Sequence, residues 1–249
     1  MTVPDLVEVS LGPGARGVFT TTGTAPGRAQ APATAGDPGF NLAAHVGDDP
    51  DRVAARRREL EEALGTRVAW MRQVHSTVVA PAALGQEPTA DALVADLRGR
   101  GPLAAGVLTA DCVPLLLASA DGRLLAAVHA GRRGMCEGVV DAALGEMARL
   151  GAAVPDILAA LGPSICGACY EVPEAMRAQV AAREPDCASR TRWGTPAIDV
   201  AAGVRAQLRR AGVRHITDVS ICTYEDERFY SYRRQGDVGR LGGVVLPVF

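Results

Sequence analysis

Two histidines and one cysteine lie at the ends of apolar runs in a chain with only four histidines. His75 follows "MRQV", Cys112 follows "LTAD", and His129 follows "LLAAV". Two imidazoles and a thiolate suit Zn²⁺, whose borderline softness accepts nitrogen and sulfur donors. Three protein ligands leave a fourth position open, which is typical of catalytic rather than structural zinc. The sequence therefore favours a zinc centre formed by His75, Cys112 and His129.

The separations between these residues are not those of a compact metal motif, and each residue alone is more often a packed or surface side chain. They would converge if the strands that they end were neighbours in one sheet and ended at the same edge. Cys112 can also act as a nucleophile, with His75 or His129 as its base. The neighbouring Asp111 can relay protons as a catalytic residue or brace the loop. These alternatives stay open at this point.

The elements that must position these residues are predicted from hydrophobic periodicity and end signals. Acidic residues and Pro50 at the start, and Gly65 at the end, predict a helix over 50–64. Further helices are expected over 136–150, 173–183 and 198–211. Strands are expected within 68–80, 104–110, 113–119, 124–130, 156–162 and 215–223, with a strand pair and Gly-rich turn at the C-terminus. Residues 20–39, rich in Gly, Pro and Thr, predict a mobile loop.

Strands and helices mix without strict alternation, which favours α/β (α+β) layering with mixed β-sheets flanked by helices. The 249 residues, of which 48% are hydrophobic, suffice for one domain over 1–249. The net charge of −2 argues against nucleic-acid and membrane-surface partners. The chain has no lysine, so lysine-based mechanisms are excluded. With no signal-peptide pattern and no apolar run of about 18 residues, we expect a cytoplasmic protein with reduced cysteines.

Six phrases occur in order along the chain: "RQVHS", "ADALV", "LTADCVPLLL", "AVHAGRRG", "LGPSICGACYEV" and "CTYEDERFYSYRRQGDVGR". Together they resemble the YfiH/DUF152 family, described as polyphenol oxidase or multicopper laccase, from about residue 41 to Arg240. The resemblance implies a YfiH-like layered fold and Zn²⁺ bound by His75, Cys112 and His129. It also implies a purine nucleoside phosphorylase acting on adenosine, inosine and methylthioadenosine, with adenosine deaminase activity. One bacterial branch is linked to peptidoglycan editing.

Phosphorolysis needs an anion site, and the turn "HAGRRG" offers one. Backbone N–H groups near Gly131 and the guanidinium of Arg133 can hold phosphate. Arg56 and Arg233 are further candidates, although each is more often a salt-bridging surface residue. Two departures from the family pattern bear on the substrate. Arg132 stands where the family has Trp, and "FTTTGTAPG" lacks the Arg-Gly-Gly that usually follows "FST".

Two other functions compete for the same residues. A copper polyphenol oxidase needs more histidine ligands than four histidines can give to several coppers. A cysteine hydrolase, such as a peptidoglycan-editing amidase, would use Cys112 as nucleophile. The "CGAC" segment at 166–169 has metal-type spacing but lacks a second C-x-x-C pair, so loop packing is the expected role. Protein partners are not predicted by any feature of the chain.

Overall fold

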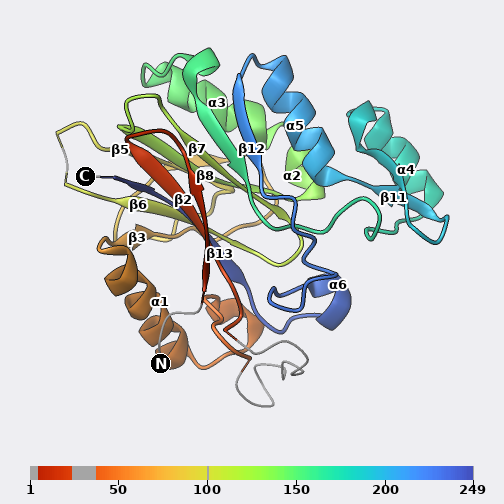
Figure 1. Ribbon diagram of the computed structural model, residues 1–249, viewed down its shortest axis with the longest axis horizontal. Helices are drawn as coiled ribbons and strands as arrows, with labels where there is room; N and C mark the ends of the chain where they lie inside the picture. The colour runs from red at the N-terminus through yellow and green to blue at the C-terminus, as the bar shows by residue number, and fades with distance from the viewer. Residues whose placement is uncertain (1–4, 24–37, 100, 249) are drawn as a thin grey trace.

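The computed structural model describes residues 5–23, 38–99 and 101–248 (Figure 1). Its strands are β1 (Leu6–Ser10), β2 (Ala15–Thr20), β3 (Val68–Ala69), β4 (Val79–Pro81), β5 (Ala92–Asp96), β6 (Ala104–Thr109), β7 (Val113–Ala118), β8 (Leu124–Ala130), β9 (Leu158–Leu161), β10 (Ala188–Arg190), β11 (Pro196–Ile198), β12 (His215–Asp218) and β13 (Leu241–Pro247). Its α-helices are α1 (Pro50–Leu64), α2 (Arg132–Glu137), α3 (Val139–Arg149), α4 (Glu174–Ala181), α5 (Val200–Arg210) and α6 (Tyr232–Gln235). Short 3₁₀ turns occupy Ala44–Val46, Val154–Asp156 and Pro185–Cys187.

Two mixed sheets form the centre of the molecule. One has the order β1-β2-β13-β6-β3, and the other has the order β12-β9-β7-β8-β5-β4. In the first sheet only β3 and β6 run parallel; in the second, the parallel pairs are β12 with β9 and β4 with β5. The expectation of mixed sheets flanked by helices is confirmed.

The layers follow from where the apolar side chains of each strand point. In β7, Leu115 and Leu117 pack in the core shared with α3 and α5, while Leu116 packs between the two sheets. Both faces of this strand are therefore buried, which explains its unbroken apolar run. The outer face of the five-stranded sheet is covered by α1 through a core that includes Leu60 and Trp70. The order is helices, sheet, sheet, helix, and Figure 1 shows α1 and α3 on opposite sides.

The helix predicted over 50–64 is confirmed, and its ends have local causes. The Asp49 carboxylate accepts hydrogen bonds from the backbone N–H groups of Asp51 and Arg52, and Pro50 begins the helix. Gly65 ends the helix in the left-handed region, at φ 69°. These signals lie within a few residues of each end, so the sequence alone determines the helix.

The expected C-terminal strand pair is wrong. Residues 232–235 form the short helix α6, and only β13 follows, pairing with β2 and β6 from distant parts of the chain. The Arg234 side chain stabilises the turns before α6 by donating hydrogen bonds to the carbonyls of Thr223, Tyr224 and Phe229. Strands β1, β2, β5, β10 and β11 were not predicted. Each has only three to six residues, and a strand this short shows little of the alternating pattern that predicts one.

Residues 24–37 of the predicted loop lie outside the described residues. Among the residues that are described, no helix has the length and apolar character needed to cross a membrane.

Candidate metal centre and cavity

The candidate ligands come from places where the chain passes between the two sheets. His75 lies in the segment between β3 and β4, and Cys112 lies directly between β6 and β7. In each case the first strand belongs to the five-stranded sheet and the second to the six-stranded sheet. His129 is near the end of β8, opposite Pro114 of β7. The expectation that the three residues end neighbouring strands of one sheet is therefore wrong. His75 and Cys112 lie in two separate connections between the sheets, and His129 lies in a strand of the six-stranded sheet.

The three side chains nevertheless meet. One ligand atom from each of His75, Cys112 and His129 lies within 4.8 Å of the other two. The Sγ of Cys112 is 3.6 Å from Nε2 of His75. The two imidazole rings are 4.6 Å apart at an angle of 70°. His129 is buried and His75 is exposed, so the cluster is closed on one side and open on the other. An open side is what a catalytic metal centre requires.

Asp91 orients two of these ligands, although the sequence analysis did not single it out. Its carboxylate, which is fully buried, lies 2.8 Å from Nδ1 of His129, so the other ring nitrogen, Nε2, is left to face Cys112. The same carboxylate accepts the backbone N–H groups of His75 at 2.9 Å and Ser76 at 2.6 Å. A carboxylate behind a histidine ligand fixes its tautomer and ring orientation. The only sequence signal was an acidic residue placed directly before the apolar run of β5.

The backbone at the centre is unusual in two places. His75 has φ 59° and Asp111 has φ 86°, a region that residues with a side chain seldom adopt. The hydrogen bond from the His75 N–H to Asp91 helps to hold the first of these conformations. A Cβ at Gly131 would lie 2.6 Å from Cδ2 of His75 and 3.1 Å from Sγ of Cys112. Glycine at position 131 therefore allows these two ligands to approach the start of α2.

Proton equilibria at the centre are strongly shifted. Burial opposes ionisation of Cys112, but His129 and His75 outweigh it and lower the pKa of the thiol to about 6. Burial likewise opposes protonation of His129, but Cys112 and Asp91 outweigh it and raise its pKa to about 9. Against the effect of burial, hydrogen bonds from His129 and Ser76 hold the pKa of Asp91 well below its usual range. At pH 7 the metal-free pair is therefore a thiolate beside an imidazolium.

The trio lies in the wall of a cavity of about 370 Å³, within the range of roughly 300–1,000 Å³ typical of small-molecule sites. The rest of the lining is His45, Gln73, Leu108, Thr109, Ala110, Asp111, Arg132, Ile165, Tyr170, Val200, Tyr232, Arg233 and Arg240. The lining thus includes three arginines and two tyrosines beside the candidate metal ligands.

Two further residues expected at the site, Asp111 and Arg233, do line the cavity and are joined to each other. The two carboxylate oxygens of Asp111 accept the Thr223 hydroxyl and the Arg233 backbone N–H, each at 2.7 Å. The Arg233 side chain donates to the Glu171 carbonyl at 2.7 Å and stacks 4.9 Å from the centre of the Tyr170 ring. Asp111 therefore braces the loop beside Cys112, and Arg233 holds the wall around Tyr170.

Arg56 and Arg133 lie outside the cavity lining. Arg56 is buried in α1, where it pairs with Asp48 at 3.0 Å. Arg133 points outward and pairs with Glu137 at 2.9 Å. Arg132 is the arginine of this turn that faces the cavity. Its side chain has no hydrogen-bond or ion-pair partner among the residues that the structure describes.

Sequence reasoning also missed His45 and Arg240, which come from opposite ends of the chain. His45 lies in the 3₁₀ turn before α1, and Arg240 directly precedes β13. The Arg240 N–H donates to the Asn41 side chain at 2.8 Å, which joins the two segments. Partial desolvation and the charge of Arg240 lower the pKa of His45. Both residues fall within the quoted or matched family segments, but no local pattern placed them together.

Comparison with known proteins agrees with this architecture. Residues 19–247 match the family described as multi-copper polyphenol oxidoreductase laccase. A purine nucleoside phosphorylase of Streptomyces coelicolor is 51% identical over 213 residues, covering 83% of this chain and 87% of that protein. One of Corynebacterium glutamicum is 44% identical over 241 residues, covering 93% and 94%. The crystal structure of a DUF152 protein of Neisseria meningitidis matches with a TM-score of 0.83 at 30% identity, covering 98% of this chain and 99% of that one.

Fold and site together define a layered protein with two mixed sheets and a histidine–cysteine centre where the chain crosses between them. The chain belongs to the laccase-domain family also called YfiH/DUF152.

Proposed function

We propose that this protein is a zinc-dependent purine nucleoside phosphorylase of the cytoplasm, acting on adenosine, inosine or methylthioadenosine. One observation carries the proposal: His75, Cys112 and His129 converge in the wall of a cavity large enough for a small molecule. Relatives named purine nucleoside phosphorylase support it, since they match most of this chain at up to 51% identity.

The donor set fits one zinc ion. Two nitrogens and one sulfur match the ligand preference of zinc, and Asp91 supplies the carboxylate that usually supports such a histidine. A multi-copper centre needs more histidines than the four of the whole chain. When bound by His75, Cys112 and His129, zinc would supply Lewis-acid polarisation to a substrate atom or to water.

The rest of the cavity suits a nucleoside and an anion. The guanidinium of Arg132 is the best candidate for phosphate, because it faces the cavity and has no protein partner among the described residues. This assignment replaces Arg133, whose charge is paired outside the cavity. The rings of Tyr170 and Tyr232 can contact a purine face. Asp111 is a positioning residue in this proposal, because both of its oxygens already accept hydrogen bonds.

Adenosine deamination belongs to the same proposal, since it needs water activated beside the purine ring. The exposed side of the cluster, at His75, gives water and substrate access to the same centre. Phosphorolysis and deamination would then differ in which reactant, phosphate or water, lies in the cavity with the nucleoside.

A second candidate is a cysteine hydrolase, and one observation favours it. In the metal-free protein the Cys112 thiol has its pKa lowered to about 6, and His129 has its pKa raised to about 9. A thiolate paired with an imidazolium is the usual form of a catalytic cysteine. A substrate with an amide bond, such as a muropeptide, would then react at Cys112.

The test is incubation of the purified protein with adenosine, with and without phosphate, followed by chromatography of adenine, ribose 1-phosphate and inosine. We expect adenine and ribose 1-phosphate only in the incubation with phosphate, and inosine in the incubations with and without phosphate. Cys112→Ala should abolish all three products, and Cys136→Ser, a half-buried cysteine on α2, should not. Wild-type product formation by Cys112→Ala would contradict the proposal.

Metal removal separates the two candidates. Loss of activity with a chelator, and its return with Zn²⁺, supports the metal-dependent phosphorylase. Hydrolytic activity of the metal-free protein, with a covalent adduct on Cys112, supports the cysteine hydrolase.

A further inference from the structure

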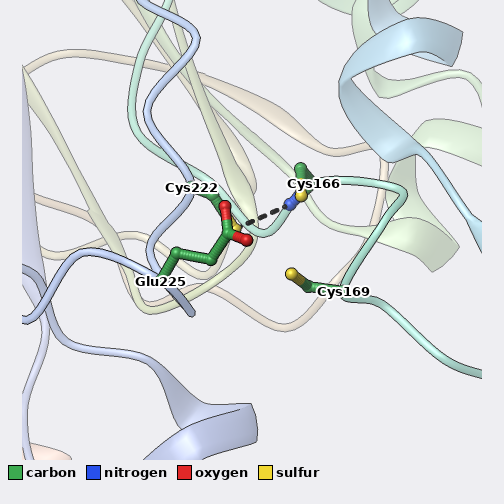
Figure 2. Close-up of side chains that lie close together, drawn as sticks. All are labelled: Cys166, Cys169, Cys222 and Glu225. Carbon is green, nitrogen blue, oxygen red and sulfur yellow. Dashed lines mark hydrogen bonds between the residues drawn. The ribbon is translucent and has the colours of Figure 1, made fainter. Parts of the chain in front are cut away.

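A second cluster of metal-type ligands lies apart from the centre described above. It consists of Cys166, Cys169, Cys222 and Glu225, and each offers a ligand atom within 4.8 Å of the others (Figure 2). None of these four residues lines the cavity that contains His75. The cluster joins the "CGAC" segment to a second turn from a distant part of the sequence.

The two turns share the same pattern of backbone hydrogen bonds. The N–H groups of Cys169 and Tyr170 both donate to the Cys166 carbonyl at 3.0 Å. In the second turn, the N–H groups of Glu225 and Asp226 donate to the Cys222 carbonyl at 3.1 and 2.9 Å. Each turn therefore presents two donor side chains at the C-x₂-C spacing of structural zinc sites, with Glu225 in the last position. The sequence has no second C-x₂-C pair, and the structure supplies the equivalent pair as C-x₂-E, from Cys222 and Glu225.

Protein hydrogen bonds hold these turns side by side. Ser164 donates its N–H to the Ile221 carbonyl at 3.1 Å and accepts the Thr223 N–H at 3.1 Å. The Cys166 N–H points at the Cys222 sulfur at 3.4 Å, as the dashed line in Figure 2 shows. The ligands are thus brought together by the fold itself, which lowers the conformational entropy lost on binding an ion.

The surroundings balance the charge that such a site would carry. Arg192 donates to the Cys169 sulfur at 2.7 Å and forms an ion pair with Glu225. Three thiolates and a carboxylate carry four negative charges, of which a divalent ion and Arg192 together neutralise three. Tetrahedral zinc with Zn–S bonds of about 2.3 Å places sulfurs about 3.8 Å apart, so the cluster must contract only slightly.

We propose that Cys166, Cys169, Cys222 and Glu225 form a structural Zn²⁺ site, separate from the His75–Cys112–His129 centre. Soft thiolate ligands select zinc over the hard divalent cations. The site would fix one wall of the cavity, because Ile165 and Tyr170 flank its first turn and line that wall. It would also fix Asp111, which accepts the hydroxyl of Thr223 in the second turn.

Metal analysis of the full-length protein, loaded with ZnCl₂ and freed of excess by buffer exchange, tests the proposal. We expect two zinc ions per chain in the wild type and in the control Cys136→Ser. Cys112→Ala should retain one ion, and so should Cys169→Ser/Cys222→Ser. Loading with Co²⁺ adds a spectroscopic signature. Cys112→Ala should keep most of the thiolate-to-cobalt charge-transfer absorption, since three of the four thiolate ligands remain.

One zinc per chain in the wild type and none in Cys112→Ala would overturn the proposal. So would four rather than six titratable thiols after denaturation without reductant, because two of the cysteines would then form a disulfide. Cys112→Ala keeps this cluster intact, so the test does not depend on the folding of the double variant. The zinc count is also independent of activity, so a failed phosphorolysis assay would leave this inference standing.

Discussion

Gly131→Ala is the sharpest perturbation of the candidate metal centre. Gly131 has φ −74° and ψ 164°, an extended conformation that alanine adopts without strain. The effect of the substitution is therefore steric. Its Cβ would lie 2.6 Å from Cδ2 and 3.0 Å from Nε2 of His75, and 3.1 Å from the Cys112 sulfur.

The size of the effect follows from these distances. Restoring an ordinary contact of 3.4 Å requires the His75 ring to retreat by roughly 0.8 Å. Metal–ligand distances tolerate deviations of only about 0.2 Å. We therefore expect zinc affinity to fall by about 10- to 100-fold, as when a supporting residue of a metal site is lost. This corresponds to about 1.4–2.8 kcal/mol.

The assay is competition for Zn²⁺ against a chromophoric chelator. It uses the Cys169→Ser/Cys222→Ser background, in which the second cluster is disrupted, so that only zinc bound by the His75–Cys112–His129 centre is measured. Gly145→Ala is the matched control, because its Cβ on α3 meets nothing within 4 Å. It should leave affinity unchanged and stabilise the fold by up to about 1 kcal/mol. In excess chelator, Gly131→Ala should unfold near the wild-type denaturant midpoint, and Gly145→Ala should unfold at that midpoint or slightly above it. Wild-type zinc affinity in Gly131→Ala would refute the close approach of His75 and Cys112 to this turn.

Three further predictions concern the same cavity. Asp91→Asn should weaken zinc binding by about 10- to 100-fold in the same competition assay, because it removes the acceptor behind His129; unchanged affinity would exclude that orienting role. Zinc affinity should rise about tenfold per pH unit between pH 6 and 9, because the metal displaces one proton, from His129, while Cys112 is already a thiolate. Below pH 6 the dependence should steepen, since Cys112 must also lose its proton, and a flat profile of affinity against pH would disprove the pairing. Arg132→Ala should raise the KM for phosphate by about tenfold or more, whereas Arg133→Ala should leave it near the wild-type value; equal effects would contradict the assignment of phosphate to Arg132.

Elements whose signals are local were predictable. The helix α1 needs only its Asp49 cap, its Pro50 start and Gly65 at its end. The strand β8 matches the expected range of 124–130 because its run is apolar apart from His129 and is buried on both faces. The short strands β2 and β5 were missed, because each is stabilised by a partner far along the chain: β13 pairs with β2, and β8 pairs with β5.

The sequence by itself determined which residues have the chemistry of a metal centre. His75, Cys112 and His129 were identified from their donor atoms, their positions after apolar runs and the family phrases around them. Those features are properties of short segments, so no tertiary contact was needed to read them.

Only the tertiary structure decided what surrounds that chemistry. It placed Asp91 behind His129, turned Arg132 rather than Arg133 toward the cavity, and brought Cys222 beside Cys166. The direction of a side chain and the meeting of distant turns depend on sheet pairing and packing across the whole chain. Adjacent arginines and isolated cysteines carry no local signal of which one will face a site, so only the folded chain distinguishes them.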